Sequence, residues 1–451
     1  MSVNIKDFAQ KLLDRALEKG FSDAEIYMSG SSSLGISTLD GEIDKFESSS
    51  SRGVCFRGTY NSKMGYSYSE LIDDEAIDII ITEAMQNSEI LEEEEQDKLY
   101  KGGDTYPEIS GFSEELKNIS VEDKINAALS MEKSAKNTSD MIKGVDFNEL
   151  EYRQSNIMIA NTYGLNIEYE SNGAAGYAYA RAVKDGETKT GLEFWAGLDW
   201  KDFDPQKTGK TASEIAISKL GAKSTKSGQY KIIVQNIAFA EFLGAFSDVF
   251  LADKAQKGLS LLTGKLNEKI AADSFTLRDD PVYPGSLRAT PFDAEGVASY
   301  NKAIIENGVF KTFLHNLKTA AKDGVKSTGN ASKAGYKAPV KVAPKNLYVS
   351  AGTVSKDELL KRAGEGIYIT DLAGLHSGTD EISGDFSLSA EGFLIENGKL
   401  TKPVEQITIA GNFFDILKDI EAVADNLRFS ESRAGSPDVY IKSLAVAGSG
   451  E

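Results

Sequence analysis

The first hydrophobic positions of the chain recur at helical spacing. Ile5, Phe8 and Leu12 fall on one side of a helical projection, and Gly20 follows the last position of the pattern. We therefore expect an amphipathic helix near the start. Beyond it, apolar and polar residues alternate with period two in short runs, at 24–28, 34–36, 53–57 and 64–68. This alternation predicts an antiparallel meander, which a second helix from Asp74 to about Met85 completes.

A second unit of helix and strands follows a polar stretch. Ser120 with Asp123 three residues later is typical of a helix N-terminus, so we expect a helix from Val121 to about Lys136. Alternation returns over residues 156–200, with glycine turns between the runs, as in an antiparallel meander. Another helix is expected to begin at Asp204-Pro205. The polar break that follows it predicts a domain boundary.

The C-terminal half contains two Asn-Gly turns between apolar alternations, at 307–308 and 397–398. Asn-Gly is the strongest short signal for a hairpin, because both residues tolerate positive φ. Either a duplicated hairpin unit or repeated use of a favourable turn explains the pair. The complete pattern predicts an α+β fold in four parts. These are a helix-plus-antiparallel-meander N-terminal domain (1–90), an acidic linker (91–119), a middle domain of helix and antiparallel strands (120–225) and a β-hairpin-rich C-terminal domain (226–451).

Charge and cysteine content narrow the possible functions. The formal net charge is −19, and residues 71–125 alone carry 17 acidic and 4 basic side chains. Such a surface repels phosphate backbones, so we expect no nucleic-acid partner. The first residues lack a signal-peptide pattern, and no apolar run approaches the roughly 18 residues of a membrane span. The single cysteine, Cys55, lies in an apolar strand. We therefore expect a cytoplasmic protein without disulfides or membrane contact.

The chain has only two histidines, His315 and His376. Imidazole is the commonest neutral metal ligand, and neither histidine begins a His-Glu-x-x-His pattern. Because His315 follows two apolar residues, we expect a structural histidine at the surface of a sheet. His376 lies in the segment 374–387, which is dense in small and polar residues. A loop of this kind either carries a binding site or is a plain glycine-rich connection.

Paired carboxylates offer another route to metal binding. Asp279-Asp280 and Asp380-Glu381 have the oxygen donors that hard cations prefer. Asp280 precedes Pro281, however, and Asp before Pro is an ordinary way to open a turn. The turn interpretation is favoured over the metal interpretation.

An ordered series of short blocks resembles the PmbA (TldE) branch of the TldD/PmbA family. Members of this family are known as peptide-maturation metallopeptidases and were once called modulators of DNA gyrase. The first domain also looks like the family's, at Asp40-Gly41-Glu42 and Arg52-Gly53-Val54. From about Ser260 onward the blocks are Ser260–Ile270 leading to Asp279-Asp280-Pro281, Phe292–Gly296, Ser327–Asn330, Ser383–Ser387, Gly392–Gly398 and Pro403 through Thr408–Asn412.

The resemblance identifies what this chain lacks. In the catalytic TldD branch, a helix ahead of Ser260 carries a His-Glu-x-x-x-His motif, and a late cysteine completes the metal site. Counting back without gaps places Leu243 to Asp248 at that motif. The span 236–255 contains no histidine in any register, and no cysteine follows Cys55. The apolar residues of the span 236–255 are typical of a helix that packs in a core. The resemblance therefore implies no catalytic residue and no metal on this chain, with a divalent metal such as zinc on a TldD-type partner.

The expected function follows from this implied partnership. The chain would be the non-catalytic subunit of a cytoplasmic TldD/TldE-type metallopeptidase that matures or degrades unfolded peptides. An extended peptide can be held at a strand edge by main-chain hydrogen bonds, which the hairpin-rich C-terminal half would offer. A homodimer is possible when the chain is isolated. Two alternatives stay open: a self-sufficient metallopeptidase with ligands among Asp248, Asp279, Asp280 and Asp385, and a non-enzymatic binding or regulatory protein.

The residues expected to touch substrate or partner lie in the family-like loops. The sequence does not decide which of the two each one contacts. They are Thr328, Gly329, Asn330, His376, Gly384, Asp385 and Asn412.

Overall fold

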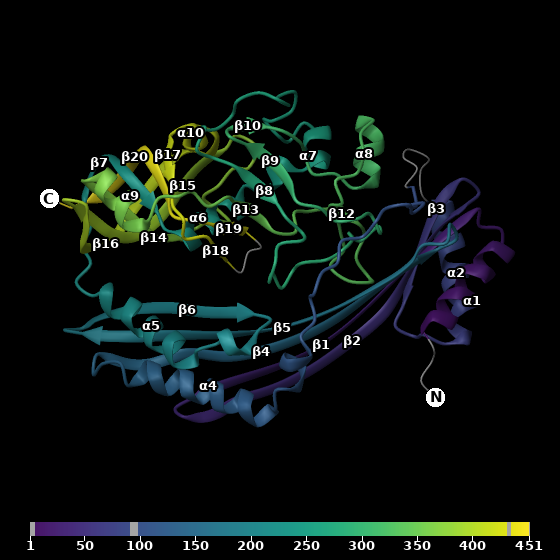
Figure 1. The fold of residues 1–451 in the computed structure, drawn as a ribbon, viewed down its shortest axis with the longest axis horizontal. Coiled ribbons are helices and arrows are strands. Elements are labelled where there is room, and N and C mark those ends of the chain that lie inside the picture. Colours follow the sequence, from purple (N-terminus) through teal and green to yellow (C-terminus); the bar gives the residue numbers. More distant parts are fainter. Residues whose placement is uncertain (1–4, 91–97, 431–433, 451) are drawn as a thin grey trace.

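A long, curved antiparallel sheet runs the length of the molecule (Figure 1). The computed structural model describes residues 5–90, 98–430 and 434–450. The strand order of this sheet is β3-β2-β1-β4-β5-β6. Its strands are β1 (Asp23–Leu39), β2 (Glu42–Tyr60), β3 (Lys63–Ser69), β4 (Ile142–Asn161), β5 (Asn166–Lys184) and β6 (Glu187–Gly197).

The meander near the N-terminus and the meander of the middle segment belong to this one sheet. They join because β1 pairs with β4 from Glu25↔Asn161 to Ser37↔Glu149. Period-two alternation gives each long strand two different faces. Ile26 and Phe56 point into a core with the N-terminal helices, whereas Tyr27 and Cys55 point toward the C-terminal domain. Cys55 is buried in β2, as its apolar neighbours predict.

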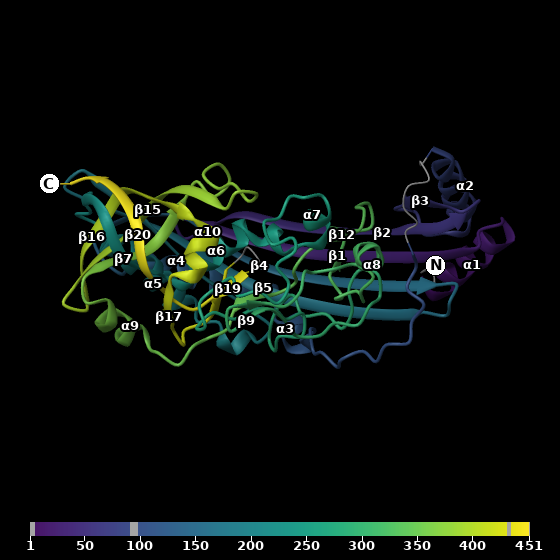
Figure 2. The same ribbon diagram turned by 90° about the horizontal axis from the view of Figure 1, so that it is seen from above.

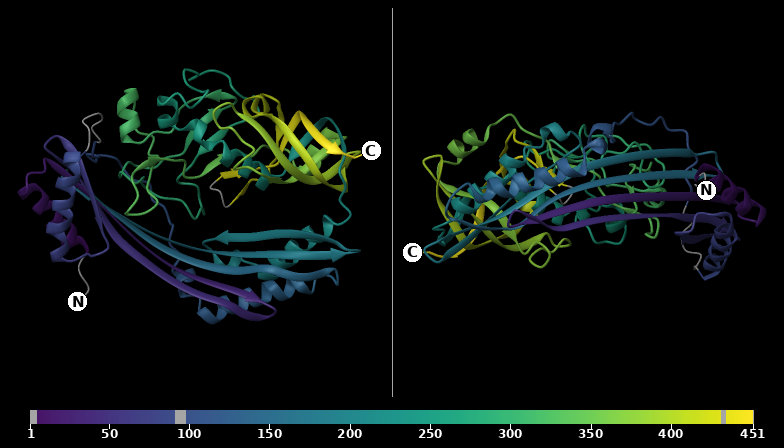
Figure 3. Two further views of the ribbon diagram at one scale, coloured as in Figure 1. Left: turned by 180° about the vertical axis from the view of Figure 1, so that it is seen from behind. Right: turned by 90° about the horizontal axis from the view of Figure 1, so that it is seen from below.

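Helices cover the face of the sheet that lies away from the C-terminal domain, two near each end (Figures 1 and 3). Helices α1 (Ile5–Glu18) and α2 (Asp74–Ile90) pack at one end, and α4 (Val121–Lys136) and α5 (Pro205–Ser218) at the other. Short helices α3 (Glu114–Asn118) and η1 (Trp200–Asp202) lie between them in the chain. The predicted N-caps are confirmed, because Ser120 accepts from the Asp123 amide and Asp204 from the Lys207 amide. Of the predicted acidic linker, residues 91–97 lie outside the described residues.

The C-terminal domain lies over the other face of the long sheet (Figure 2). One of its sheets has the order β16-β15-β14-β7-β20-β17, and β16 also pairs with β20, so five strands close on themselves. These strands are β7 (Lys226–Val234), β14 (Gly366–Ala373), β15 (Asp385–Glu396), β16 (Lys399–Asn412), β17 (Ile420–Val423) and β20 (Val439–Ser449).

A second sheet of shorter strands completes the domain, in the order β10-β9-β8-β13-β19-β18. Its strands are β8 (Leu277–Asp279), β9 (Lys302–Glu306), β10 (Val309–Phe310), β13 (Leu347–Val349), β18 (Arg428–Phe429) and β19 (Ala434–Ser436). A separate two-stranded sheet pairs β11 (Ala331–Ser332) with β12 (Lys341–Val342). The helices of the domain are α6 (Asn236–Ala245), η2 (Ser247–Phe250), α7 (Ala252–Gln256), α8 (Leu317–Asp323), α9 (Lys356–Ala363) and α10 (Phe413–Lys418). The largest apolar core of the described residues includes α6 and strands of both sheets. The α+β prediction is thereby confirmed.

Both predicted Asn-Gly turns form. Asn307 and Gly308 have φ of 48° and 79°, and Asn397 and Gly398 have φ of 53° and 71°. The first turn joins β9 to the two-residue β10, and the second joins the long strands β15 and β16 of the other sheet. The hairpins differ in length and in sheet. Repeated use of a favourable turn explains them better than duplication of a unit.

Candidate functional site

The helix at the place of the family's metal-binding motif is an element of the apolar core. Leu243 on α6 and Phe246 just after it have no exposed surface. The Phe246 ring stacks on Phe413 of α10 at 4.6 Å between centroids, and Phe242 meets Phe386 of β15 edge-to-face at 5.0 Å. Alkyl and phenyl groups donate no electron pair to a metal, so the predicted packing role of this helix is confirmed.

A cavity of about 460 Å³ opens beside the end of this helix. It is lined by Asp248 of η2, Lys254 of α7 and the loop from Thr379 to Ile382. The Lys254 ammonium lies 2.7 Å from Asp248 and 3.9 Å from Glu381. Burial and the charge of Asp248 raise the pKa of Glu381, which Lys254 opposes. A lysine cation therefore already balances the carboxylates of the cavity.

A metal does not fit the residues of this region. In the parts of the chain that the structure describes, no three His, Cys, Asp or Glu side chains are grouped so as to hold an ion. Asp279, an alternative ligand, is fully buried. It accepts hydrogen bonds from the Lys345 and Asn346 amides at 2.7 and 3.0 Å and from Asn330 at 2.7 Å. Its neighbour Asp280 accepts from the Val282 amide at 3.0 Å, which is the predicted turn interaction.

Three of the predicted contact residues form a tight group near this cavity. Gly384 directly precedes β15 and has φ of 83°, so a side chain there would be strained. The side-chain amide of Asn412 donates to the Ser383 carbonyl and to the Asp385 carboxylate, both at 2.9 Å. Asn412 also accepts from the Phe414 amide and so caps α10. His376 lies on the same loop, exposed at a turn after β14. The group holds the 374–387 loop against α10.

The other three predicted residues are buried in the C-terminal domain. Thr328 donates to the Asn330 side chain at 2.8 Å, and Asn330 donates to Asp279. Gly329, between them, has φ of 70°. Among the described residues, no hydrogen bond or ion pair connects this group to Gly384, Asp385 and Asn412. The structure therefore places the seven residues in two sets, one inside the domain and one at an exposed loop.

The predicted position of His315 in a sheet is wrong. It lies outside any strand, directly before the N-cap of α8, and is only 5% exposed. Its backbone amide donates to Thr328 at 2.6 Å, and its carbonyl accepts from the Asn330 amide at 3.2 Å. The Thr328–Asn330 turn thus covers this histidine and removes it from water. Burial lowers the pKa of His315.

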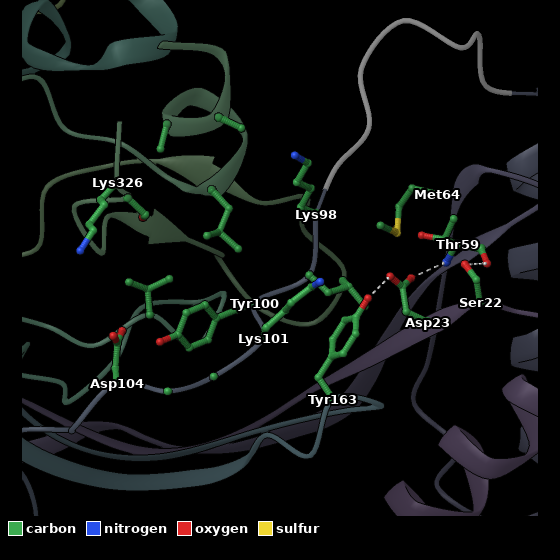
Figure 4. Close-up of a pocket in the computed structure, with 18 of the residues that line it drawn as sticks. Ser22, Asp23, Thr59, Met64, Lys98, Tyr100, Lys101, Asp104, Tyr163 and Lys326 are labelled. Atoms are coloured by element: carbon green, nitrogen blue, oxygen red, sulfur yellow. Dashed lines mark hydrogen bonds between the residues drawn. The ribbon is translucent and has the colours of Figure 1, made fainter. Parts of the chain in front are cut away.

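A larger cavity, about 1080 Å³, lies where the N-terminal end of the long sheet meets the C-terminal domain (Figure 4). Its lining includes Lys98, Tyr100 and Lys101 from the segment after the acidic run, and Lys326 after α8. The Lys101 ammonium lies 5.2 Å from the centre of the Tyr163 ring.

The carboxylates of this larger cavity already have hydrogen-bond donors. Asp23 accepts from the Tyr163 hydroxyl at 2.9 Å and from the Thr59 amide at 3.2 Å. Asp104 accepts from the Ala298 amide at 3.1 Å. Sequence reasoning missed this cavity because its wall comes from segments more than 200 residues apart. The one local signal is Gly102-Gly103, at φ of 79° and 104°, beside the lysines.

A buried ion cluster ties the sheet to the C-terminal domain. The Arg57 guanidinium of β2 lies 2.7 Å from the Glu25 carboxylate of β1 and 3.6 Å from the carboxylate of Glu295, in the C-terminal domain. All three side chains are at most 4% exposed. Glu295 also accepts from the Leu317 amide at 2.8 Å. Burial raises the pKa of both carboxyls, while Arg57 opposes the rise. The cluster fixes how the long sheet packs against the C-terminal domain.

Comparisons with known proteins agree with this architecture. A Thermotoga maritima structure, a candidate modulator of a DNA gyrase, has 32% identity and a TM-score of 0.92 over 98% of this chain and 100% of that one. A metalloprotease of Methanocaldococcus jannaschii is 27% identical over 94% of each chain. The structure of TldE from Thermococcus kodakarensis, at 23% identity and a TM-score of 0.91 over 98% of this chain and 100% of that one, shares the fold.

Family models cover the chain in order. The model of the PmbA/TldA metallopeptidase domain 1 matches residues 24–88, that of the central domain residues 114–220, and that of the C-terminal domain residues 227–448. These matches include both meanders of the long sheet and nearly all of the domain above it. The chain therefore belongs to the PmbA/TldA metallopeptidase family.

Proposed function

We propose that this chain is the PmbA/TldE-like, non-catalytic subunit of a cytoplasmic metallopeptidase that acts on unfolded peptides. The metal, a divalent ion such as zinc, would belong to a TldD-type partner. One observation carries the proposal: the place of the metal-binding motif is occupied by core side chains, Leu243 and Phe246, that cannot ligate an ion. Next to it, Lys254 supplies the positive charge that balances Asp248.

The exposed loop residues are the proposed contacts to partner or substrate. His376 and Asp385 are both exposed, and the hydrogen bonds of Asn412 hold the loop that carries them. Thr328, Gly329 and Asn330 would act indirectly, because they are buried and position the backbone around His315. Among the described helices, none is long and apolar enough to cross a membrane.

Reconstitution tests the subunit role. The purified chain, a relative that carries the His-Glu-x-x-x-His helix, and an equimolar mixture are each assayed for metal content and for cleavage of an unfolded peptide. We expect cleavage in the mixture, none by this chain alone, and metal only with the relative. Stoichiometric metal on this chain, together with cleavage, would contradict the proposal and favour a self-sufficient peptidase.

Variants locate the contacts within the complex. His376→Ala and Asp385→Asn should raise the KM or weaken association with the relative, whereas Lys402→Ala, an exposed change on β16, should leave both unchanged. A complex in which all three variants behave alike would show that the loop touches neither peptide nor partner. A chain that never associates with such a relative would favour a separate binding or regulatory role.

A further inference from the structure

Half of β2 is a free sheet edge. This strand pairs with β1 from Leu39↔Glu42 to Asp23↔Thr59. On its other side, β3 pairs only with Val54 to Tyr60. Within the described residues, the outer edge of 42–53 therefore has no strand beside it. Every residue from Glu42 to Arg52 is exposed.

This edge has some of the features that prevent strand addition and lacks others. Proteins shield such edges with charged side chains, proline, short strands, bulges that turn the edge away, or a covering element. Five of the eleven residues from Glu42 to Arg52 are charged, so only a strand of complementary charge can pair here. The segment 42–52 has no proline and no glycine, and its side chains include Ile43 and Phe46, which are 45% and 51% exposed. Lys45 is its one lysine. An uncovered edge of this length with an exposed aromatic side chain is suited to pairing with another strand.

The charges along the edge are self-complementary in one antiparallel register. If Phe46 lies opposite Phe46 of a second copy, Lys45 lies opposite Glu47 of that copy, and the reverse pair forms by symmetry. Asp40, which this register would align with Arg52, lies in the turn before β2 and already pairs with Lys136 at 2.9 Å, so it does not count toward the contact. The register fits the free length, because it ends at the Asp40-Gly41 turn on one side and before Val54, where β3 begins to pair, on the other.

Neighbouring registers are less favourable. A symmetric register centred on Glu47 would place two glutamates directly opposite each other, which is destabilising. A register centred on Ser48 would pair Asp44 with Arg52 but would lose both Lys45–Glu47 pairs and place Phe46 opposite serine. Lys45 and Glu47 are exposed. Within the described residues both act on Glu149 of β4, whose pKa burial and Glu47 raise and Lys45 lowers.

We propose that two copies of this chain associate through their β2 edges, antiparallel and centred on Phe46, so that the six-stranded sheets of both copies join. The inference concerns self-association and stands independently of the proposed peptidase role. The surface and its occupant are both specified, because the pairing is a two-fold contact of one strand with itself.

Charge exchange tests this register. Self-association is measured by sedimentation velocity across a dilution series. Lys45→Glu and Glu47→Lys each replace both Lys45–Glu47 pairs beside Phe46 by pairs of like charge. Each variant should therefore weaken self-association at least about tenfold. An equimolar mixture of the two variants restores opposite charges at both places and should associate like the wild type. The double variant Lys45→Glu/Glu47→Lys should do the same.

A matched control separates the edge from general charge effects. Lys402→Glu makes the same change on exposed β16 and should leave self-association unchanged. Circular dichroism of each variant confirms that the fold is kept. A wild type that is monomeric at every concentration overturns the proposal. So does a Lys45→Glu variant that behaves like Lys402→Glu, or a mixture of the two single variants that fails to recover.

Discussion

Removal of the Arg57 guanidinium should strongly destabilise the contact between the long sheet and the C-terminal domain. The variant Arg57→Met keeps the length of the side chain but leaves Glu25 and Glu295 buried without their cation. Breaking a buried ion pair by removing one partner costs about 3–5 kcal/mol. The three side chains are at most 4% exposed, so solvent does little to reduce this cost.

The cost should depend on pH with a definite sign. Burial raises the pKa of Glu25 and Glu295 above the ordinary value of 4.5, so the folded state keeps protons that the unfolded state releases. The contribution of these groups to the free energy of unfolding therefore falls as pH rises from about 4.5 through neutrality. Arg57 limits this fall by lowering both pKa values. Its removal should make the fall steeper, and Arg57→Met should lose more stability at pH 8 than at pH 5.

Urea unfolding followed by circular dichroism at pH 5 and pH 8 measures both effects. The triple variant Arg57→Met/Glu25→Gln/Glu295→Gln should recover most of the loss, because it removes the uncompensated charges. An Arg57→Met protein within about 1 kcal/mol of the wild type at pH 8, or with no dependence on pH, would refute the reasoning.

Three further changes test the region beside the small cavity, each by the shift in urea midpoint. Phe246→Ala should cost about 3–5 kcal/mol, because a fully buried ring leaves a cavity; a loss below 1 kcal/mol would show that the helix is not core. Asn412→Ala should cost about 1–2 kcal/mol through the lost cap of α10 and the freed loop, and a neutral result would contradict that role. Lys254→Met should cost only about 0.5–1 kcal/mol, since the pair with Asp248 is partly exposed. It should also raise the pKa of Glu381 further, and an unchanged Glu381 titration by NMR would contradict the contact.

Local sequence patterns predicted the secondary structure well and the histidine environment badly. Ser120 and Asp204 mark helix starts because a cap is a contact within three residues, and the Asn-Gly turns need only two residues of suitable φ. His315 follows apolar residues that look like a strand. Its surroundings are set by Thr328, which folds back over it from 13 positions along the chain. Contacts of that range leave no periodic signal.

The candidate site shows the same division. The absence of histidine around Leu243–Asp248 can be read from the sequence in any register. The pairing of Lys254 with Glu381 cannot, because the two residues come from α7 and a loop more than 120 positions later. The split of the seven predicted residues into a buried set and a loop set likewise depends on burial and distant hydrogen bonds.

The sequence by itself determined the elements, the turns and the lack of histidine at the family's motif, because each depends on which side chains stand within a few positions of one another. Only the tertiary structure decided that β1 pairs with β4, that Arg57 joins two carboxylates from different layers, and that half of β2 is left as an edge. These features arise from strand pairing and burial across the whole chain. Their energies depend on exclusion from water, which a linear pattern does not record.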